Sequence, residues 1–80
     1  MTWWISSEAS EARLDRLRDL LDRRRVTYRA AARILAILGA PCYGKPPDET
    51  MTDDQHIAIC NALTGATDGM AGEVERLILD

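Results

Sequence analysis

Residues 8–39 read EASEARLDRLRDLLDRRRVTYRAAARILAILG and decide the fold, because they hold two consecutive helical patterns. The first pattern is a stripe of leucines at helical spacing, formed by Leu14, Leu17 and Leu21. In the second pattern, Thr27 is a favourable N-cap, and no Gly or Pro interrupts the chain from there to Gly39. A spacing of three and four residues puts apolar side chains on one face of a helix. The stretch therefore predicts helices at about residues 8–25 and 27–38.

Glycine and proline interrupt the chain after the second helix. Residues 39–51 contain two glycines and three prolines, which favour an irregular loop. Beyond this loop, Thr52 and Gln55 have the spacing of a capping box, in which each side chain accepts a hydrogen bond from the backbone of the other residue. The pattern predicts two further helices, at about residues 53–64 and 69–79.

A chain of 80 residues is long enough for one small domain. Its hydrophobic content of 46% and charged content of 29% indicate a globular fold rather than a disordered chain. The sequence therefore predicts an all-α, four-helix domain spanning residues 1–80, with no internal repeat. We expect Trp3 and Trp4 to cover the core, and Ser6 or Ser7 to cap the first helix. The expected interior consists of Leu14, Leu17, Leu21, Ala31, Leu35, Ile57, Leu63, Val74 and Leu77.

Membrane, enzymatic and metal-binding functions find little support in the composition. No run approaches the roughly 20 apolar residues of a membrane-spanning helix, and we expect a cytoplasmic protein. With one histidine, two cysteines and no phosphate-binding glycine loop, the sequence predicts neither an enzyme nor a cofactor. His56, Cys60, Cys42 and Asp53 could be considered as zinc ligands. They lack the paired spacing of structural zinc sites, so no metal site is predicted.

Charge is distributed unevenly along the chain. Residues 1–45 carry nine bases and five acids, a net charge of +4, whereas residues 46–80 carry one base and eight acids, a net charge of −7. A chain polarised in this way has a directional electric field, and such a field steers association with charged partners. The basic half favours a polyanionic partner, and the acidic half favours a basic one.

Short motifs in the two halves carry a family resemblance. Thr27 stands where a capping Thr is expected after a leucine-rich helix, Ala32 at a small buried position and Leu35 at a core position. Further along, residues 59–65 read ICNALTG. Together these motifs resemble the Cro/Xre-type helix-turn-helix family. The resemblance implies a helix-turn-helix-like fold and a small DNA-binding regulator of transcription.

The segment that corresponds to the family's recognition helix is degenerate. That helix would fall on residues 37–45, which contain Gly39, Pro41 and Gly44, and proline inside a helix costs about 3 kcal/mol or more. No Arg, Lys, Asn or Gln precedes Lys45 there to read base edges. DNA contacts would therefore be made mainly to phosphates. The candidate DNA-contacting residues are Arg23, Arg24, Arg25, Tyr28, Arg29, Arg33, Tyr43 and Lys45.

A protein-binding function is the alternative that the acidic half leaves open. In size and acidity the chain resembles small phage-encoded inhibitors such as anti-CRISPR proteins, which would imply docking on a basic partner surface. The candidate residues for that contact are Asp48, Glu49, Asp53 and Asp54. Under either hypothesis we expect a homodimer through residues 69–79, because Leu77, Ile78 and Leu79 offer more apolar surface than one helix face can bury.

Overall fold

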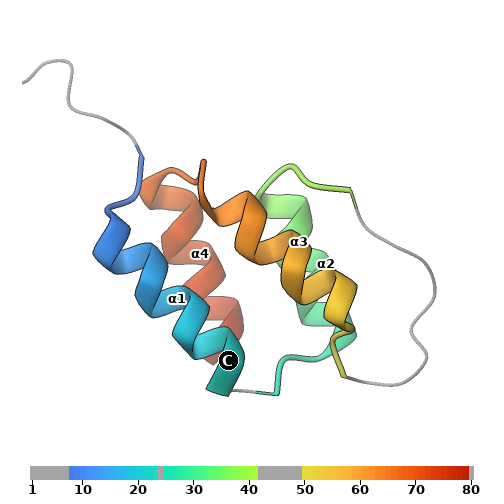
Figure 1. The fold of residues 1–80 in the computed structure, drawn as a ribbon. Helices are drawn as coiled ribbons and strands as arrows, with labels where there is room; N and C mark the ends of the chain where they lie inside the picture. Colours follow the sequence, from blue (N-terminus) through green and yellow to red (C-terminus); the bar gives the residue numbers. More distant parts are fainter. Residues whose placement is uncertain (1–7, 24, 42–49, 80) are drawn as a thin grey trace, which may run out of the picture.

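Helices account for most of the computed structural model, which describes residues 8–23, 25–41 and 50–79. The helices are, in chain order, α1 (Glu11–Arg23), α2 (Tyr28–Ile37), α3 (Asp53–Leu63) and α4 (Asp68–Leu79). Two isolated β-bridges join the described residues, which form no β-strand. The prediction of an all-α, four-helix fold is confirmed (Figure 1).

The first helix is shorter at both ends than the sequence predicts. Ser10 Oγ accepts a hydrogen bond of 3.2 Å from the backbone amide three residues later, so α1 starts at Glu11. The predicted caps Ser6 and Ser7 lie outside the described residues. The helix ends at Arg23, inside the run of three arginines that was expected to complete it.

The predicted caps of α2 and α3 are confirmed. Thr27 Oγ1 accepts a hydrogen bond of 3.1 Å from the Ala30 amide. Thr52 Oγ1 accepts from the Gln55 amide at 3.2 Å, and Gln55 Oε1 accepts from the Thr52 amide at 3.0 Å. Gln55 is also fully buried, and its Nε2 donates to the Tyr28 carbonyl at 3.5 Å. One glutamine thus caps α3 and ties it to the start of α2.

The two β-bridges fix the directions of the helices. The bridge between Glu8 and Thr67 holds the starts of α1 and α4 side by side, and the bridge between Thr27 and Thr50 does the same for α2 and α3. Helices α1 and α4 therefore run in one direction and α2 and α3 in the other (Figure 1). The end of α2 and the start of α3 therefore lie toward opposite ends of the domain, because the ten residues of α2 span about 15 Å.

The bridges also relate the two halves of the chain as a structural repeat, which is distinct from the sequence repeat that was not expected. Helices α1 and α2 form one helix–turn–helix unit and α3 and α4 form another, each with a four-residue connection; we call each unit a hairpin, although its two helices pack mainly against those of the other unit. The Ala9 amide donates to the Ala66 carbonyl at 2.9 Å, and the Met51 amide donates to the Val26 carbonyl at 2.8 Å. The segment before each hairpin thus bonds to the turn of the other hairpin. Buried residues occupy corresponding positions in the two hairpins: Leu17 corresponds to Ile59, Ala31 to Ala71, and Ile34 to Val74.

The core lies where the two hairpins meet. Its buried hydrophobic residues are Leu14, Leu17, Leu21, Val26, Ala31, Ile34, Leu35, Ile59, Leu63, Ala66, Ala71, Val74 and Ile78. All predicted interior residues belong to it except Ile57 and Leu77. Ile57 is 56% exposed, because two residues turn a helix by about 200° and Ile59 occupies the buried side. Leu77 is half-buried, since its neighbour Ile78 faces the core. Trp3 and Trp4 lie outside the described residues.

Candidate functional site

The arginines of α1 are neutralised by carboxylates. Arg13 pairs with Asp68 and lies 3.6 Å from Glu75 across the interface with α4, and Arg16 lies 2.8 Å from the same Glu75. Within α1, two further pairs are Arg18 with Asp15 at 3.4 Å and Arg23 with Asp19 at 3.1 Å. The charge of α1 is therefore largely compensated, and Arg23, a predicted DNA contact, is an ion-paired residue.

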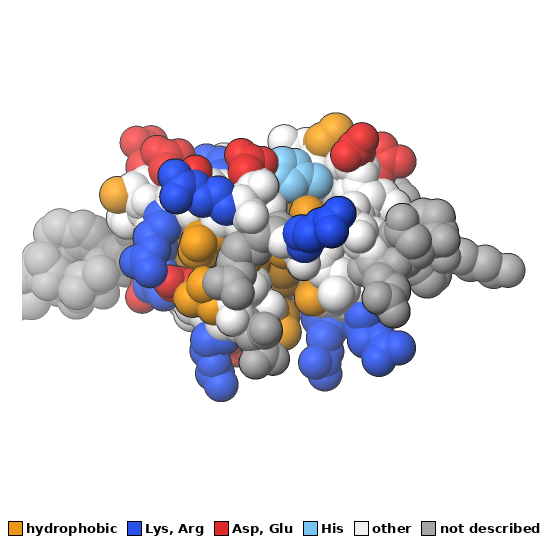
Figure 2. All heavy atoms as spheres, turned by 90° about the horizontal axis from the view of Figure 1, so that it is seen from below, with side chains coloured by type: hydrophobic (Ala, Val, Ile, Leu, Met, Phe, Trp, Pro, Cys, Tyr) orange, Lys and Arg blue, Asp and Glu red, His pale blue; other side chains and the backbone are white. Residues whose placement is uncertain are grey.

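Four other arginines are exposed and have no such compensation. No carboxylate of the described residues lies within ion-pairing distance of them. We call this set the basic face: Arg25, Arg29, Arg33 and Arg76. Figure 2 shows most of the acidic side chains along one edge of the molecule, with some basic side chains among them, and only basic side chains projecting prominently from the opposite edge. The basic face belongs to α2, α4 and the turn before α2. Most acids of the helices lie instead on α1 and α3, and two acids of α4, Asp68 and Glu75, pair with arginines of α1.

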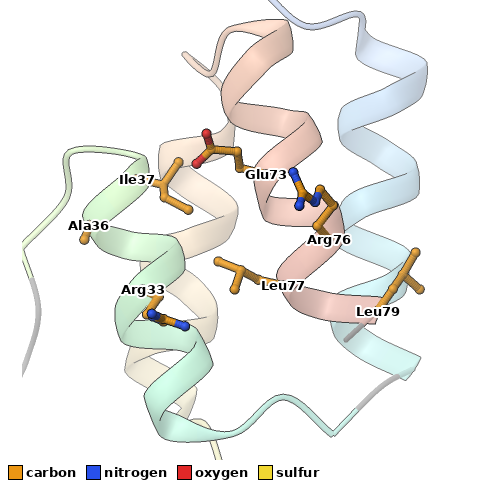
Figure 3. A pocket seen from close by; sticks show the side chains of 7 residues that line it. All are labelled: Arg33, Ala36, Ile37, Glu73, Arg76, Leu77 and Leu79. Carbon is orange, nitrogen blue, oxygen red and sulfur yellow. The ribbon is translucent and has the colours of Figure 1, made fainter.

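An open groove of about 830 Å³ runs between α2 and α4 on this side. It is lined by Arg33, Ala36, Ile37, Glu73, Arg76, Leu77 and Leu79. In Figure 3, Ile37 and Leu77 point from the two helices into the space between them, and Leu79 points away from α2. The floor of the groove is therefore aliphatic, and its rim carries two guanidinium groups and the carboxylate of Glu73.

A second hollow, of about 230 Å³, continues the groove toward the start of α2. It shares Arg33 and Leu77 with the larger groove and adds Arg25 and Arg29 to its walls. Arg25, Arg29 and Arg33 stand four residues apart, and Arg29 and Arg33 occupy the same side of α2. The hollow and the groove form one continuous basic surface.

The structure brings together only part of the predicted DNA-contacting set. Tyr28 is half-buried at the start of α2 and lines neither the groove nor the hollow. The Arg24 side chain, Tyr43 and Lys45 lie outside the described residues. Arg76 was not predicted, although it is the only basic residue of residues 46–80 and therefore stood out in the acidic half. Its place beside Arg33 depends on the packing of α4 against α2.

No recognition helix follows α2 directly. Leu38 is the C-cap of α2, and Gly39 has φ 73°, a left-handed conformation that glycine adopts without strain. Residues 38–41 are not helical, which agrees with the expectation of a degenerate segment as far as Pro41. Residues 42–49 lie outside the described part of the chain, and the next helix starts at Asp53.

Two of the predicted protein-binding acids lie beside the exposed isoleucine of α3. Asp53 and Asp54 are exposed in the first turn of the helix, and Ile57 follows one turn later. Neither carboxylate pairs with a cationic side chain of the described residues. We call these three residues the acidic edge of α3. The other predicted acids, Asp48 and Glu49, lie outside the described residues.

His56 links α1 to α3 and lies near a free thiol. Its Nε2 is 2.9 Å from Asp22 Oδ1, and its Nδ1 is 4.0 Å from Cys60 Sγ. Burial raises the pKa of the Cys60 thiol, the Arg18 guanidinium opposes this rise, and Asp22 adds to it. A raised pKa keeps the thiol protonated, which makes it a poor nucleophile. Among the described residues no group of three or more His, Cys, Asp or Glu is arranged to hold a metal ion, and Cys42 lies outside them.

Comparison with known proteins gives no relative: no protein-family model, curated protein or solved structure matches the chain at a significant level.

Within residues 8–23, 25–41 and 50–79, no helix combines the length and the apolar character needed to cross a membrane. Of the three apolar residues expected to form a homodimer contact on α4, Ile78 is buried, Leu77 is half-buried and Leu79 is 43% exposed. Functional proposals therefore rest on the charged surfaces and on the groove.

Proposed function

We propose that this chain is a small DNA-binding protein that contacts DNA mainly through phosphates. The observation that carries the proposal is the basic face, on which four exposed arginines have no carboxylate partner among the described residues. Guanidinium groups donate paired hydrogen bonds to phosphate oxygens, and a free guanidinium does not have to give up an ion pair to do so.

Geometry and charge distribution support a contact through this face. Arg29 and Arg33 are separated by one helical turn, about 6 Å along α2, so both can approach one phosphate backbone at once. The acids of α1 and α3 lie toward the opposite edge (Figure 2). At physiological salt a charge is screened beyond about 8–10 Å, so a phosphate at the basic face responds to the nearby arginines more than to the net charge of −3.

The proposed contact carries little sequence information. Readout in the major groove of DNA requires a helix or a β-ribbon that presents donors and acceptors to base edges. Residues 38–41, which follow α2, are not helical. A role in transcription of the Cro/Xre type is supported by the short sequence motifs alone, around Thr27 and Leu35 and at residues 59–65. Phosphate binding is the part of the proposal that the surface supports.

A mobility-shift experiment with duplex DNA tests the proposal. At about 50 mM salt, where phosphate contacts are strong, we expect the wild-type chain to retain DNA and the Arg29→Ala/Arg33→Ala variant to lose most of the shift. The matched control is Arg16→Ala/Arg23→Ala, which removes the same charge from two ion-paired arginines of α1. Absence of any shift by the wild-type chain at this salt concentration would refute DNA binding.

The acidic edge of α3 favours a second candidate function, an inhibitor that docks on a basic protein surface. A large aliphatic side chain that is 56% exposed beside two free carboxylates has the composition of a small interface centre with a charged rim. A pull-down should then capture a basic protein with the wild-type chain and lose it with Ile57→Ser or with Asp53→Asn/Asp54→Asn. A Glu11→Gln variant, changed at an exposed acid of α1, is the control and should capture the same protein.

A further inference from the structure

The two candidate surfaces are complementary to each other. The groove between α2 and α4 has an aliphatic floor, formed by Ile37 and Leu77, and its rim carries the guanidinium groups of Arg33 and Arg76 and the carboxylate of Glu73, which leaves the rim with a net positive charge. The acidic edge of α3 presents one exposed aliphatic side chain and two carboxylates. From this match we infer that two copies of the chain associate head to tail, with the acidic edge of α3 of one copy seated in the groove of the next.

The dimensions of the two surfaces agree. The groove is lined by three residues of α2 and four of α4, and its aliphatic floor, formed by Ile37 and Leu77, extends over about one helical turn. On α3, Asp53 and Asp54 precede Ile57 by four and three residues and therefore occupy the same side of the helix. One aliphatic anchor with carboxylates one turn away fits a short apolar floor whose rim carries two cations and one carboxylate.

The floor distinguishes this contact from phosphate binding. Phosphates need cations and hydrogen-bond donors, but they gain nothing from Ile37 and Leu77, which water now partly covers. Covering these half-buried side chains with another aliphatic group removes apolar surface from water, which favours association by about 25 cal/mol for each Å². The apolar floor and the exposed Ile57 are each left without a function by DNA binding alone.

Charge selects the head-to-tail arrangement over a symmetric one. If two grooves faced each other across a two-fold axis, the basic faces of both copies would come together and repel. The acidic and basic edges lie on opposite sides of the molecule, so head-to-tail stacking places opposite charges in contact (Figure 2). A heterologous contact of this kind leaves one groove and one acidic edge unoccupied at the ends of a dimer, so association continues into a ring or an open filament. This association goes beyond the proposed DNA binding and does not depend on it.

Sedimentation of wild-type protein over a concentration series tests the inference. At low salt the average mass should rise with concentration from the 8.9 kDa of one copy to more than that of two, and high salt should return it to one copy. A mass of one copy at every concentration in low salt would overturn the inference. Assembly that nuclease treatment abolishes would assign the groove to nucleic acid and would overturn it as well.

Two complementary variants separate this contact from any symmetric one. Arg33→Ser/Arg76→Ser impairs only the groove, and Ile57→Ser with Asp53→Asn/Asp54→Asn impairs only the acidic edge. All these side chains except Ile57 are polar, and all are exposed, so circular dichroism should show unchanged helix content. Each variant alone should stay a single copy, while an equimolar mixture should form a dimer and nothing larger. Assembly by either variant alone, or no dimer in the mixture, would refute the head-to-tail contact.

Discussion

Removing Arg29 and Arg33 together should change the salt dependence of DNA binding by a calculable amount. Each phosphate neutralised by the protein contributes about −0.9 to the slope of log K against log salt, so the four arginines of the basic face predict a slope of about −3.6. Between about 50 and 200 mM salt, the wild-type affinity should then fall about 150-fold. The double alanine variant keeps two contacts, and its affinity should fall only about 12-fold over the same range. Fluorescence anisotropy of a labelled duplex at several salt concentrations measures both slopes.

The control for this experiment comes from α1. Arg16 and Arg23 are exposed, like the residues of the basic face, but each already lies within 3.1 Å of a carboxylate oxygen. Their double alanine variant has the same net charge as Arg29→Ala/Arg33→Ala, and it should leave the slope close to the wild-type value. Equal slopes for all three proteins, or an equal loss for both variants, would refute the assignment of phosphate contacts to the basic face.

The remaining predictions concern stability and reactivity. In urea denaturation, Ile59→Ala should lower the free energy of unfolding by about 2–5 kcal/mol, whereas Ile57→Ala on the exposed side of the same helix should change it by less than about 0.5 kcal/mol. Gln55→Leu should cost about 1–3 kcal/mol in the same assay, because it removes the capping hydrogen bond of the Thr52 amide and the bond from Gln55 to the Tyr28 carbonyl. Because burial raises the pKa of the Cys60 thiol, its contribution to stability is complete below the ordinary thiol pKa of 9.0 and is lost as the pH rises above it. In a Cys42→Ser background, Cys60 should therefore be alkylated more slowly in the folded chain than in urea; equal rates would contradict this.

The helices could be predicted because the signals that define them are local. The leucine stripe of α1 repeats at helical spacing, and Thr27 caps α2 through a hydrogen bond to an amide only three residues away. The capping box of Thr52 and Gln55 is equally local. A pattern of residues within one turn is sufficient to predict such features. The irregular region after Gly39 was predicted for the same reason, as far as the structure describes it.

Features that depend on packing between helices could not be predicted in this way. The sequence offers three serines that can cap the first helix, at positions 6, 7 and 10. The helix starts after Ser10, next to Ala9, whose backbone bonds to the second hairpin, and the sequence does not indicate this bond. Ile57 and Ile59 are chemically the same side chain. Which of them is buried depends on where α2 lies around α3.

The candidate site shows the same division. Arg29 and Arg33 were predicted as neighbours because they are one turn apart on α2. Two other features depend on where α4 packs, and no local pattern indicates this: Glu75 neutralises Arg16, and Arg76 lies on the basic face. The sequence therefore indicated the charge of the surface, and the packing of distant helices determined which arginines remain available on it.

The exchanged hydrogen bonds between the hairpins have a consequence for how the protein unfolds. In the turn of the first hairpin, the Val26 carbonyl accepts a hydrogen bond from the Met51 amide. In the turn of the second, the Ala66 carbonyl accepts one from the Ala9 amide. A hairpin that separated from the other would leave these groups unpaired and would expose its half of the core to water. Neither half can therefore keep its native stability after the other has melted. The chain should lose its structure in one all-or-none transition, and damage to either half should weaken both equally.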